Sequence, residues 1–427
     1  MTLFQVAAKR RSGVIAWAVL LLSGGLVPVA LSAEDAHKIV RDYAPLERLA
    51  SDSVNAFSLE LFRILAKEEG GNMAVSPYSL DRALAAVAYG ATGETRTELL
   101  GLLRMIPSHP FRGNAGVHYP LSLLSRRLAR DRGDFSGTDM MLHAGDLNLK
   151  KEFIEGAEAL YGIRPLACDF SKPGETVAAI NSLAEQSTGG MIKEIIGESA
   201  LSPASRMVIL DTILFTGKWE EAFSPGDTRE GEFQAADGPM TVSYMSKSLS
   251  LPLIEIAGEP AASAISIPFR NGEWEMVFFK PGDLGGFLDR LVPEAFCEWM
   301  DALDAAKGVR KRMKVSIPRF SFAWEAKNLR EILGRMGMGR AFSASDAQFG
   351  GIADGERLYL SDVLHRTRIE LDESGSRAAA ASAVVVAKSL AVRTREFRLD
   401  RPFVFIVRHA ATGAAVLLGK VAKPLSE

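Results

Sequence analysis

The chain has 427 residues, of which 50 are lysine or arginine and 52 are aspartate or glutamate, so its formal net charge is −2. This balance argues against a dedicated nucleic-acid-binding protein, because no excess of basic side chains is present to neutralise phosphates. The hydrophobic content of 47% is ordinary for a globular protein. With two cysteines, Cys168 and Cys297, the fold has to rest on its own core and not on a set of disulfides.

The N-terminal segment has the pattern of a secretory signal peptide. Three basic residues at 9–11 precede an apolar run at 14–22, and small residues at 31–33 close the segment. A membrane anchor is the alternative, but the apolar run is short and is interrupted by glycines after residue 23. We therefore expect residues 1–33 to be a signal peptide and 34–51 an N-terminal extension. The protein would be secreted or periplasmic, with no membrane contact after signal removal.

The next elements are predicted to be helices. Apolar residues recur at helical spacing over 54–65, with Asp52 or Ser53 in the N-cap position. Ser76 is expected to cap a second helix over 77–90, in which proline takes the first position.

The later part of the chain is predicted to form strands. Residues 207–215 (MVILDTILF) are a nearly continuous apolar run, which is typical of a strand buried on both faces. Further extended stretches are expected at 275–279, 366–371, 403–407 and 415–418. Helices early and strands late indicate an α+β architecture with large sheets in one integrated domain.

Residues 373–388 (ESGSRAAAASAVVVAK) have an unusual pattern. Four consecutive alanines suit a short surface helix, but Gly375 and three valines oppose it. Read as a strand, the segment has one face without any charge, made of Ser376, Ala378, Ala380, Ser382, Val384 and Val386. Arg377 lies on the other face. The segment could therefore slide between two existing strands without burying a charge.

This stretch resembles the hinge of the serpins, a family of serine protease inhibitors. Further segments in the same order resemble other serpin motifs: 72–99, 181–192 (NSLAEQSTGGMI), 211–223 (DTILFTGKWEEAF), 360–365 (LSDVLH), 400–405 and 418–421. The resemblance covers residues 52–424, which we expect to form one serpin domain. The absence of an Asn-X-Ser/Thr glycosylation site fits an exported bacterial member.

The resemblance implies a serpin fold, with three β-sheets, eight to nine helices and an exposed reactive-centre loop at about 374–398. It also implies an irreversible suicide-substrate inhibitor of a serine endopeptidase. The protease would attack the loop, and the cleaved loop would insert into the main sheet and trap the acyl-enzyme. The alternative is a non-inhibitory serpin that acts as a carrier, chaperone or structural protein. An enzyme is not expected, because the sequence has no HExxH, GxSxG or phosphate-binding glycine loop.

The resemblance also assigns residues within the loop. The hinge is expected at Glu373, Gly375, Ser376, Arg377, Ala378, Ala379, Ala380, Ala381 and Ser382. Counting along the loop as in the family places the attacked bond between Ser389 and Leu390, with Lys388 and Arg393 as alternatives. The partner would be a serine protease, with a cysteine protease as another option. We expect a monomer without a cofactor or metal.

A second set of family positions is expected to control how the main sheet opens: Ser76, Ser79, Asp211 and His365. Asp211 stands where asparagine is usual in the family, and a carboxylate in an apolar strand is costly unless it is paired or protonated. We predict a contact between Asp211 and His365 that makes sheet opening sensitive to pH. The alternative is a protonated or water-bridged Asp211. Trp219 matches the tryptophan beneath the point where the loop enters the sheet.

Overall fold

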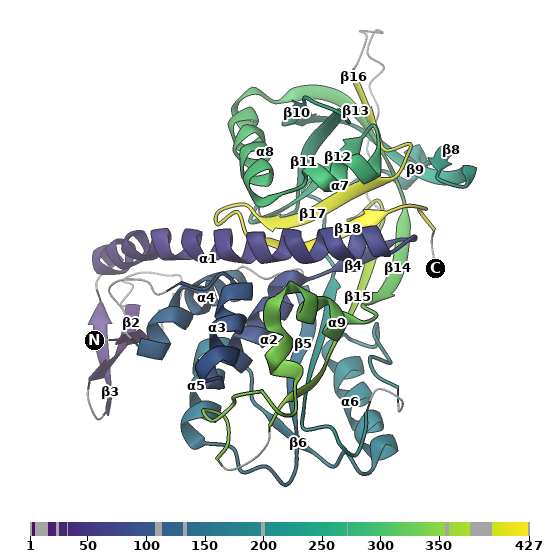
Figure 1. Cartoon of the computed structure of the whole chain (residues 1–427). Helices are drawn as coiled ribbons and strands as arrows, with labels where there is room; N and C mark the ends of the chain where they lie inside the picture. Colours follow the sequence, from purple (N-terminus) through teal and green to yellow (C-terminus); the bar gives the residue numbers. More distant parts are fainter. Residues whose placement is uncertain are drawn as a thin grey trace. The chain divides into compact units, whose positions relative to one another are not determined.

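The computed structural model describes residues 2–4, 16–22, 25–31, 33–106, 113–130, 135–197, 201–270, 272–354, 358–375 and 395–425 (Figure 1). Side chains are described from residue 44 on, except those of 113–115. The chain divides into two compact units, residues 1–49 and 50–427. Within the described residues, no helix combines the length and the apolar character needed to cross a membrane.

The first unit contains a small antiparallel sheet. Its strands are β1 (Thr2–Phe4), β2 (Ala16–Leu22) and β3 (Gly25–Leu31). They lie in the segment for which the sequence predicts a signal peptide, and removal of that segment on export stays a prediction.

The five-stranded sheet of the second unit has two long parallel neighbours. Its strand order is β14 (Phe320–Glu325), β15 (Leu360–Leu371), β7 (Met207–Phe215), β5 (Phe135–Ala144) and β6 (Leu166–Cys168). β15 and β7 are paired directly, from Leu360 opposite Met207 to Ile369 opposite Phe215. We call this line of pairing the seam. Every residue of β7 is buried, as its continuous apolar run predicts.

Two further sheets complete the second unit. The six-stranded sheet has the order β10 (Leu253–Ile256), β11 (Ala262–Pro268), β12 (Trp274–Pro281), β17 (Phe403–His409), β18 (Ala415–Val421) and β4 (Met73–Val75). The four-stranded sheet has the order β16 (Arg395–Arg398), β13 (Lys311–Pro318), β9 (Gly238–Leu251) and β8 (Arg229–Ala235). The strands expected from the sequence are therefore confirmed as β7, β12, β15, β17 and β18.

The described residues contain nine α-helices. They are α1 (Ala33–Glu68), α2 (Pro77–Gly90), α3 (Gly93–Leu102), α4 (Gly113–Arg130), α5 (Lys151–Tyr161), α6 (Pro173–Ser187), α7 (Leu284–Arg290), α8 (Pro293–Ala306) and α9 (Leu329–Leu333). Together with the three sheets of the second unit, they confirm the expected α+β architecture. α2 packs on β7 and β5 of one sheet and on β18 of another, so the helix contacts two sheets (Figure 1).

Of the two helix starts predicted from the sequence, one is confirmed and the other is wrong. α2 begins at Pro77 with Ser76 as its N-cap, as expected. The prediction of a cap at Asp52 or Ser53 is wrong, because α1 already begins at Ala33. The residues before Asp52 include many good helix formers, so the helix continues through the polar pair and does not start there.

Candidate functional site

The N-terminal end of α2 is tied to the sheets on both sides. The Ser76 hydroxyl accepts the N–H of Ser79 at 3.4 Å and donates to the carbonyl of Val416, on β18, at 2.7 Å. The backbone N–H of Ser76 donates to Nε2 of His365, on β15, at 3.1 Å. One capping residue therefore connects the helix with two sheets.

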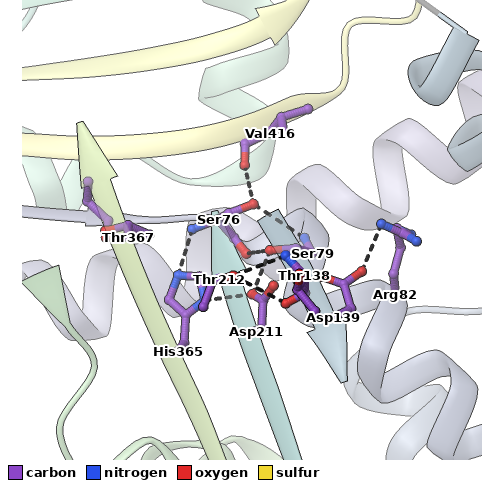
Figure 2. A network of polar contacts seen from close by, with 11 residues as sticks. Ser76, Ser79, Arg82, Thr138, Asp139, Asp211, Thr212, His365, Thr367 and Val416 are labelled. Carbon is purple, nitrogen blue, oxygen red and sulfur yellow. Dashed lines mark hydrogen bonds and ion pairs between the residues drawn. The ribbon is translucent and has the colours of Figure 1, made fainter. Parts of the chain in front are cut away.

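Figure 2 shows Ser79, Asp211 and His365 converging from α2, β7 and β15. The Ser79 hydroxyl lies 2.6 Å from Oδ2 of Asp211, and Nδ1 of His365 lies 2.6 Å from the same oxygen. Because Nε2 of His365 already accepts the Ser76 N–H, the ring proton sits on Nδ1 and is donated to Asp211. The expected contact between Asp211 and His365 is thus present, and the structure brings all four predicted residues together.

Burial determines the charge states of Asp211 and His365, because neither side chain has exposed surface. Burial raises the pKa of Asp211 to about 6, against hydrogen bonds from Asp139 and Ser79 that lower it. Burial lowers the pKa of His365 to about 3, so the ring stays neutral at physiological pH. Near pH 7 the contact therefore joins a largely ionised carboxylate to a neutral imidazole.

Two members of this network were missed by the sequence reasoning. Asp139 on β5 lies opposite Asp211 on β7, and each carboxyl group influences the pKa of the other. Nη1 of Arg82, on α2, lies 2.9 Å from Oδ2 of Asp139 (Figure 2). Nη2 of Arg82 donates to the carbonyl of Tyr161 at 2.7 Å. A signal was available, because Asp139 directly precedes the apolar pair Met-Met in a strand, just as Asp211 interrupts the apolar run of β7.

The predicted hinge begins with a tight reversal of the chain after β15. The N–H of Asp372 donates to the carbonyl of Gly375 at 2.7 Å, and the N–H of Gly375 donates back to the carbonyl of Asp372 at 3.2 Å. Oδ1 of Asp372 also accepts the N–H and the hydroxyl of Ser374, at 2.8 and 2.6 Å. Gly375 forms a second antiparallel bridge, with Lys218 just beyond the end of β7.

Position 375 requires glycine. Its φ angle is +124°, in the region that other L-residues avoid. A Cβ atom there would lie 2.2 Å from the carbonyl oxygen of Gly217 and 2.6 Å from Cα of Lys218. The hinge can therefore approach the end of β7 this closely only without a side chain.

Trp219 holds the turn from below. Its buried indole stacks on the ring of Phe269 with the centroids 4.7 Å apart. The indole N–H donates to the carbonyl of Asp372 at 3.2 Å, and the backbone N–H donates to the carbonyl of Ser374 at 3.0 Å. These contacts place Trp219 against the turn at the start of the predicted hinge.

Glu373 provides a polar anchor for the same turn. Its buried carboxylate accepts the hydroxyl of Thr228, and its second oxygen lies 3.7 Å from Nε of Arg319. Its backbone carbonyl accepts the N–H of Phe223 at 2.7 Å. Glu373 therefore connects the hinge with the segment between Trp219 and β8.

The rest of the predicted loop lies outside the described residues: Ser376, Arg377, Ala378, Ala379, Ala380, Ala381, Ser382, Lys388, Ser389, Leu390 and Arg393. At the far end the structure corrects the predicted boundary near 398. Residues 395–398 form β16, which pairs in parallel with β13, because the buried ring of Phe397 anchors them there.

Comparisons with known proteins show the family to which the chain belongs. A family model described as "Serpin (serine protease inhibitor)" matches residues 52–424. Leukocyte elastase inhibitor A of Mus musculus is 27% identical, over 89% of this chain and 100% of its own length. Antithrombin-III of Mus musculus is 28% identical, over 88% of this chain and 81% of its own length. A solved structure of native protease nexin-1 with heparin is similar with a TM-score of 0.76 at 23% identity, covering 90% of this chain and 100% of that chain. The chain therefore belongs to the serpin family.

Proposed function

We propose that this serpin is an irreversible suicide-substrate inhibitor of a protease. The protease attacks a bond in the reactive-centre loop and forms an acyl-enzyme. The freed hinge then inserts between β15 and β7 as a new strand and carries the protease with it. A relative named as an elastase inhibitor and the description of the family model support inhibition in general, and the geometry of the hinge supports the insertion step.

The observation that carries the proposal is the pair of bridges made by Gly375. One bridge joins Gly375 to Asp372 at the end of β15, and the other joins it to Lys218 just beyond β7. Both bridges are antiparallel, whereas β15 and β7 are parallel to each other. A chain that continued in this direction would enter the seam antiparallel to both strands, which is the orientation that an inserted strand needs.

The two bridges also fix a register for the inserted strand. Continuing the Asp372 bridge along β15 places Ser382 opposite His365. Continuing the Lys218 bridge along β7 places the same residue opposite Asp211. His365 and Asp211 are themselves opposite each other in the present sheet, so the two registers agree. In the same register, residues 376–386 reach as far as Met207, the first residue of β7.

This register gives each hinge residue a face. Directly opposite residues of an antiparallel pair point to the same side of the sheet. The Asp211 side chain points to α2, so Ser382 would face the interior and Arg377 would face away from it. The uncharged face noted in the sequence is thus the face that the proposal buries.

The energetics favour insertion once the loop is cut. At roughly 3.3 Å per residue, inserting residues 376–386 would move the attached protease by roughly 35 Å. A new central strand forms ladders on both sides, and about ten hydrogen bonds at roughly 1 kcal/mol each give on the order of 10 kcal/mol. The uncut protein would then be held in its present state by a kinetic barrier.

The proposal also covers the class of the target protease, the bond that it attacks and the location of the protein. A serine protease is favoured because the family model carries that description, and a cysteine protease is the other option. The attacked bond is proposed between Ser389 and Leu390, with Lys388 or Arg393 as other sites of attack. The leader-like segment 1–33 supports export to the periplasm or the medium.

The experiment mixes the purified protein with trypsin-like, chymotrypsin-like and elastase-like serine proteases and separates the products on denaturing gels. We expect a complex that survives denaturation with at least one protease, together with a released C-terminal peptide whose mass gives the cleaved bond. Cleavage with every protease but complex with none would contradict inhibition and favour a carrier, chaperone or structural role.

A further inference from the structure

Asp139, the second buried carboxyl group of the network, limits the charge that the pair of Asp139 and Asp211 can carry. Asp139 and Asp211 lie opposite each other across β5 and β7, and each carboxyl group influences the pKa of the other. The Asp139 side chain is 10% exposed, and that of Asp211 has no exposed surface. Two ionised carboxylates in contact at such depth would repel each other, because little water is present to screen them.

Among the described residues, the groups around the pair do not supply enough positive charge for two carboxylates. Arg82 is the cation in contact with the pair, through Nη1 and Oδ2 of Asp139. His365 approaches Asp211 as a neutral donor, since its Nε2 accepts a backbone N–H. Asp81, also on α2, interacts with Arg82, and burial raises the pKa of its carboxyl group well above the ordinary value.

The hydrogen bonds of Asp211 also indicate that the two carboxyl groups are not both ionised. Oδ2 of Asp211 accepts from Ser79 and His365, whereas the buried Oδ1 has no hydrogen-bond donor among the described residues. The group that faces Asp211 from β5 is the carboxyl of Asp139, which can donate only if it carries a proton.

The proton on Asp139 has a route to solvent. A cavity of about 310 Å³ lies between α2, α4 and β5, and its lining includes Asp139, Arg82, Tyr78 and Ser125. Tyr78 adds no charge at neutral pH, because burial raises the pKa of its hydroxyl above the ordinary value. Asp139 is thus the member of the pair that borders this space, whereas Asp211 is enclosed.

We propose that Asp139 and Asp211 form a proton-binding site that holds a single proton between β5 and β7 at neutral pH, and that opening the seam is coupled to the uptake of a second proton there. The pKa directions agree with the first half: burial raises the pKa of Asp139 to about 8 and that of Asp211 to about 6. Between these values the pair carries one proton.

The coupling follows from the position of His365. A strand inserted at the seam moves β15 away from β7 by about 4.8 Å, so the bond from Nδ1 of His365 to Asp211 has to break. A carboxylate that loses a donor binds a proton more tightly, so the pKa of the pair rises on opening. Opening should therefore become faster as the pH falls from 8 to 6. This half of the inference rests on the proposed loop insertion.

The first test measures the proton directly. The full-length protein is labelled with 13C at the aspartate carboxyls, and their NMR signals are followed from pH 4 to pH 9. We expect one signal that titrates near pH 8 and is absent in Asp139→Asn, whereas Asp354→Asn, an exposed control, retains it. A signal for Asp139 that titrates near pH 4 would overturn the proposal.

The second test follows opening itself, through the incorporation of a synthetic peptide with the sequence of residues 376–386. In the unmodified protein the rate should rise several-fold from pH 8 to pH 6, and by no more than about tenfold per pH unit for one proton. In Asp211→Asn the rise should be lost, because the carboxyl group that takes up the second proton is absent. Incorporation with the same pH profile in both proteins would overturn the coupling. No incorporation at any pH would contradict the proposed function, and the NMR titration would still decide the proton-binding site.

Discussion

Nδ1 of His365 on β15 donates to Oδ2 of Asp211 on β7 over 2.6 Å, and the two residues lie opposite each other in the register of the seam. The bond crosses the line along which a new strand would have to enter. Insertion therefore cannot proceed without breaking it. The same position connects the charge state of a buried carboxylate with the opening of the sheet.

Replacing Asp211 by asparagine should change how stability depends on pH. The native state binds the Asp211 proton more tightly than the unfolded chain, because its pKa is raised from 3.8 to about 6. The free energy of unfolding should therefore fall between pH 4 and pH 6, by at most about 1.4 kcal/mol per pH unit from this group. Asp211→Asn removes this slope, keeps an acceptor for His365, and should raise stability at pH 7 by about 3 kcal/mol.

Thermal unfolding of the two proteins at pH 4, 5, 6, 7 and 8 measures this difference. The exposed Asp354→Asn variant serves as the matched control and should follow the unmodified protein. Parallel curves for the unmodified protein and Asp211→Asn would show that Asp211 is not the group responsible.

Gly375→Ala should disrupt the start of the hinge. The new methyl group would contact the backbone of Gly217, and the φ angle of +124° is strained for alanine. We expect a loss of about 1–3 kcal/mol in the free energy of unfolding, together with more cleavage and less complex in the protease assay. Gly226→Ala is the control, because its Cβ would lie 3.6 Å from the nearest atom, a Ser224 hydroxyl oxygen. Equal behaviour of the two variants would argue against a close approach at 375.

The anchor at Glu373 should depend more on its hydrogen bond than on its charge. The ion pair with Arg319 is long, at 3.7 Å, and the arginine side chain is 46% exposed. Glu373→Gln keeps a partner for Thr228 and should cost less than about 1 kcal/mol. Glu373→Ala leaves that hydroxyl without its partner and should cost about 1–3 kcal/mol. Urea unfolding of both variants gives the comparison, and a larger loss in Glu373→Gln would contradict it.

The proposed register of the inserted strand can be tested with a matched pair of arginines. Ser382→Arg would place a charge between Asp211 and α2, whereas Ala383→Arg would place it on the opposite face, like the natural Arg377. We expect Ser382→Arg to turn the protein into a substrate that is cleaved without forming a complex, and Ala383→Arg to remain an inhibitor. Densitometry of complex and cleaved bands measures the ratio, and the reverse order would show that the register is shifted by one residue.

Much of this arrangement could be predicted from the sequence, because it follows from local patterns. The continuous apolar run of β7 predicted a fully buried strand, and Ser76 before Pro77 predicted the start of α2. The cluster of Ser76, Ser79, Asp211 and His365 came from the family resemblance, and the structure brings these residues into contact.

The remaining features depend on pairing between distant segments. Asp139 and Asp211 are neighbours only because β5 and β7 are antiparallel in one particular register, which no local pattern determines. The predicted start of the first helix at Asp52 or Ser53 was wrong for a related reason. A capping signal at Asp52 competes with helix formers on both sides. The bridge from Gly375 to Lys218 likewise joins segments that are far apart in the chain.

Insertion of the hinge into the seam is tested most directly by the stability of the protein before and after its loop is cut. The loop would be cleaved by a protease that does not form a complex, and the two chains, still associated, would be compared by thermal unfolding. About ten new hydrogen bonds predict an increase in Tm on the order of ten degrees for a domain of this size. An unchanged or lower Tm after cleavage between 383 and 394 would contradict insertion.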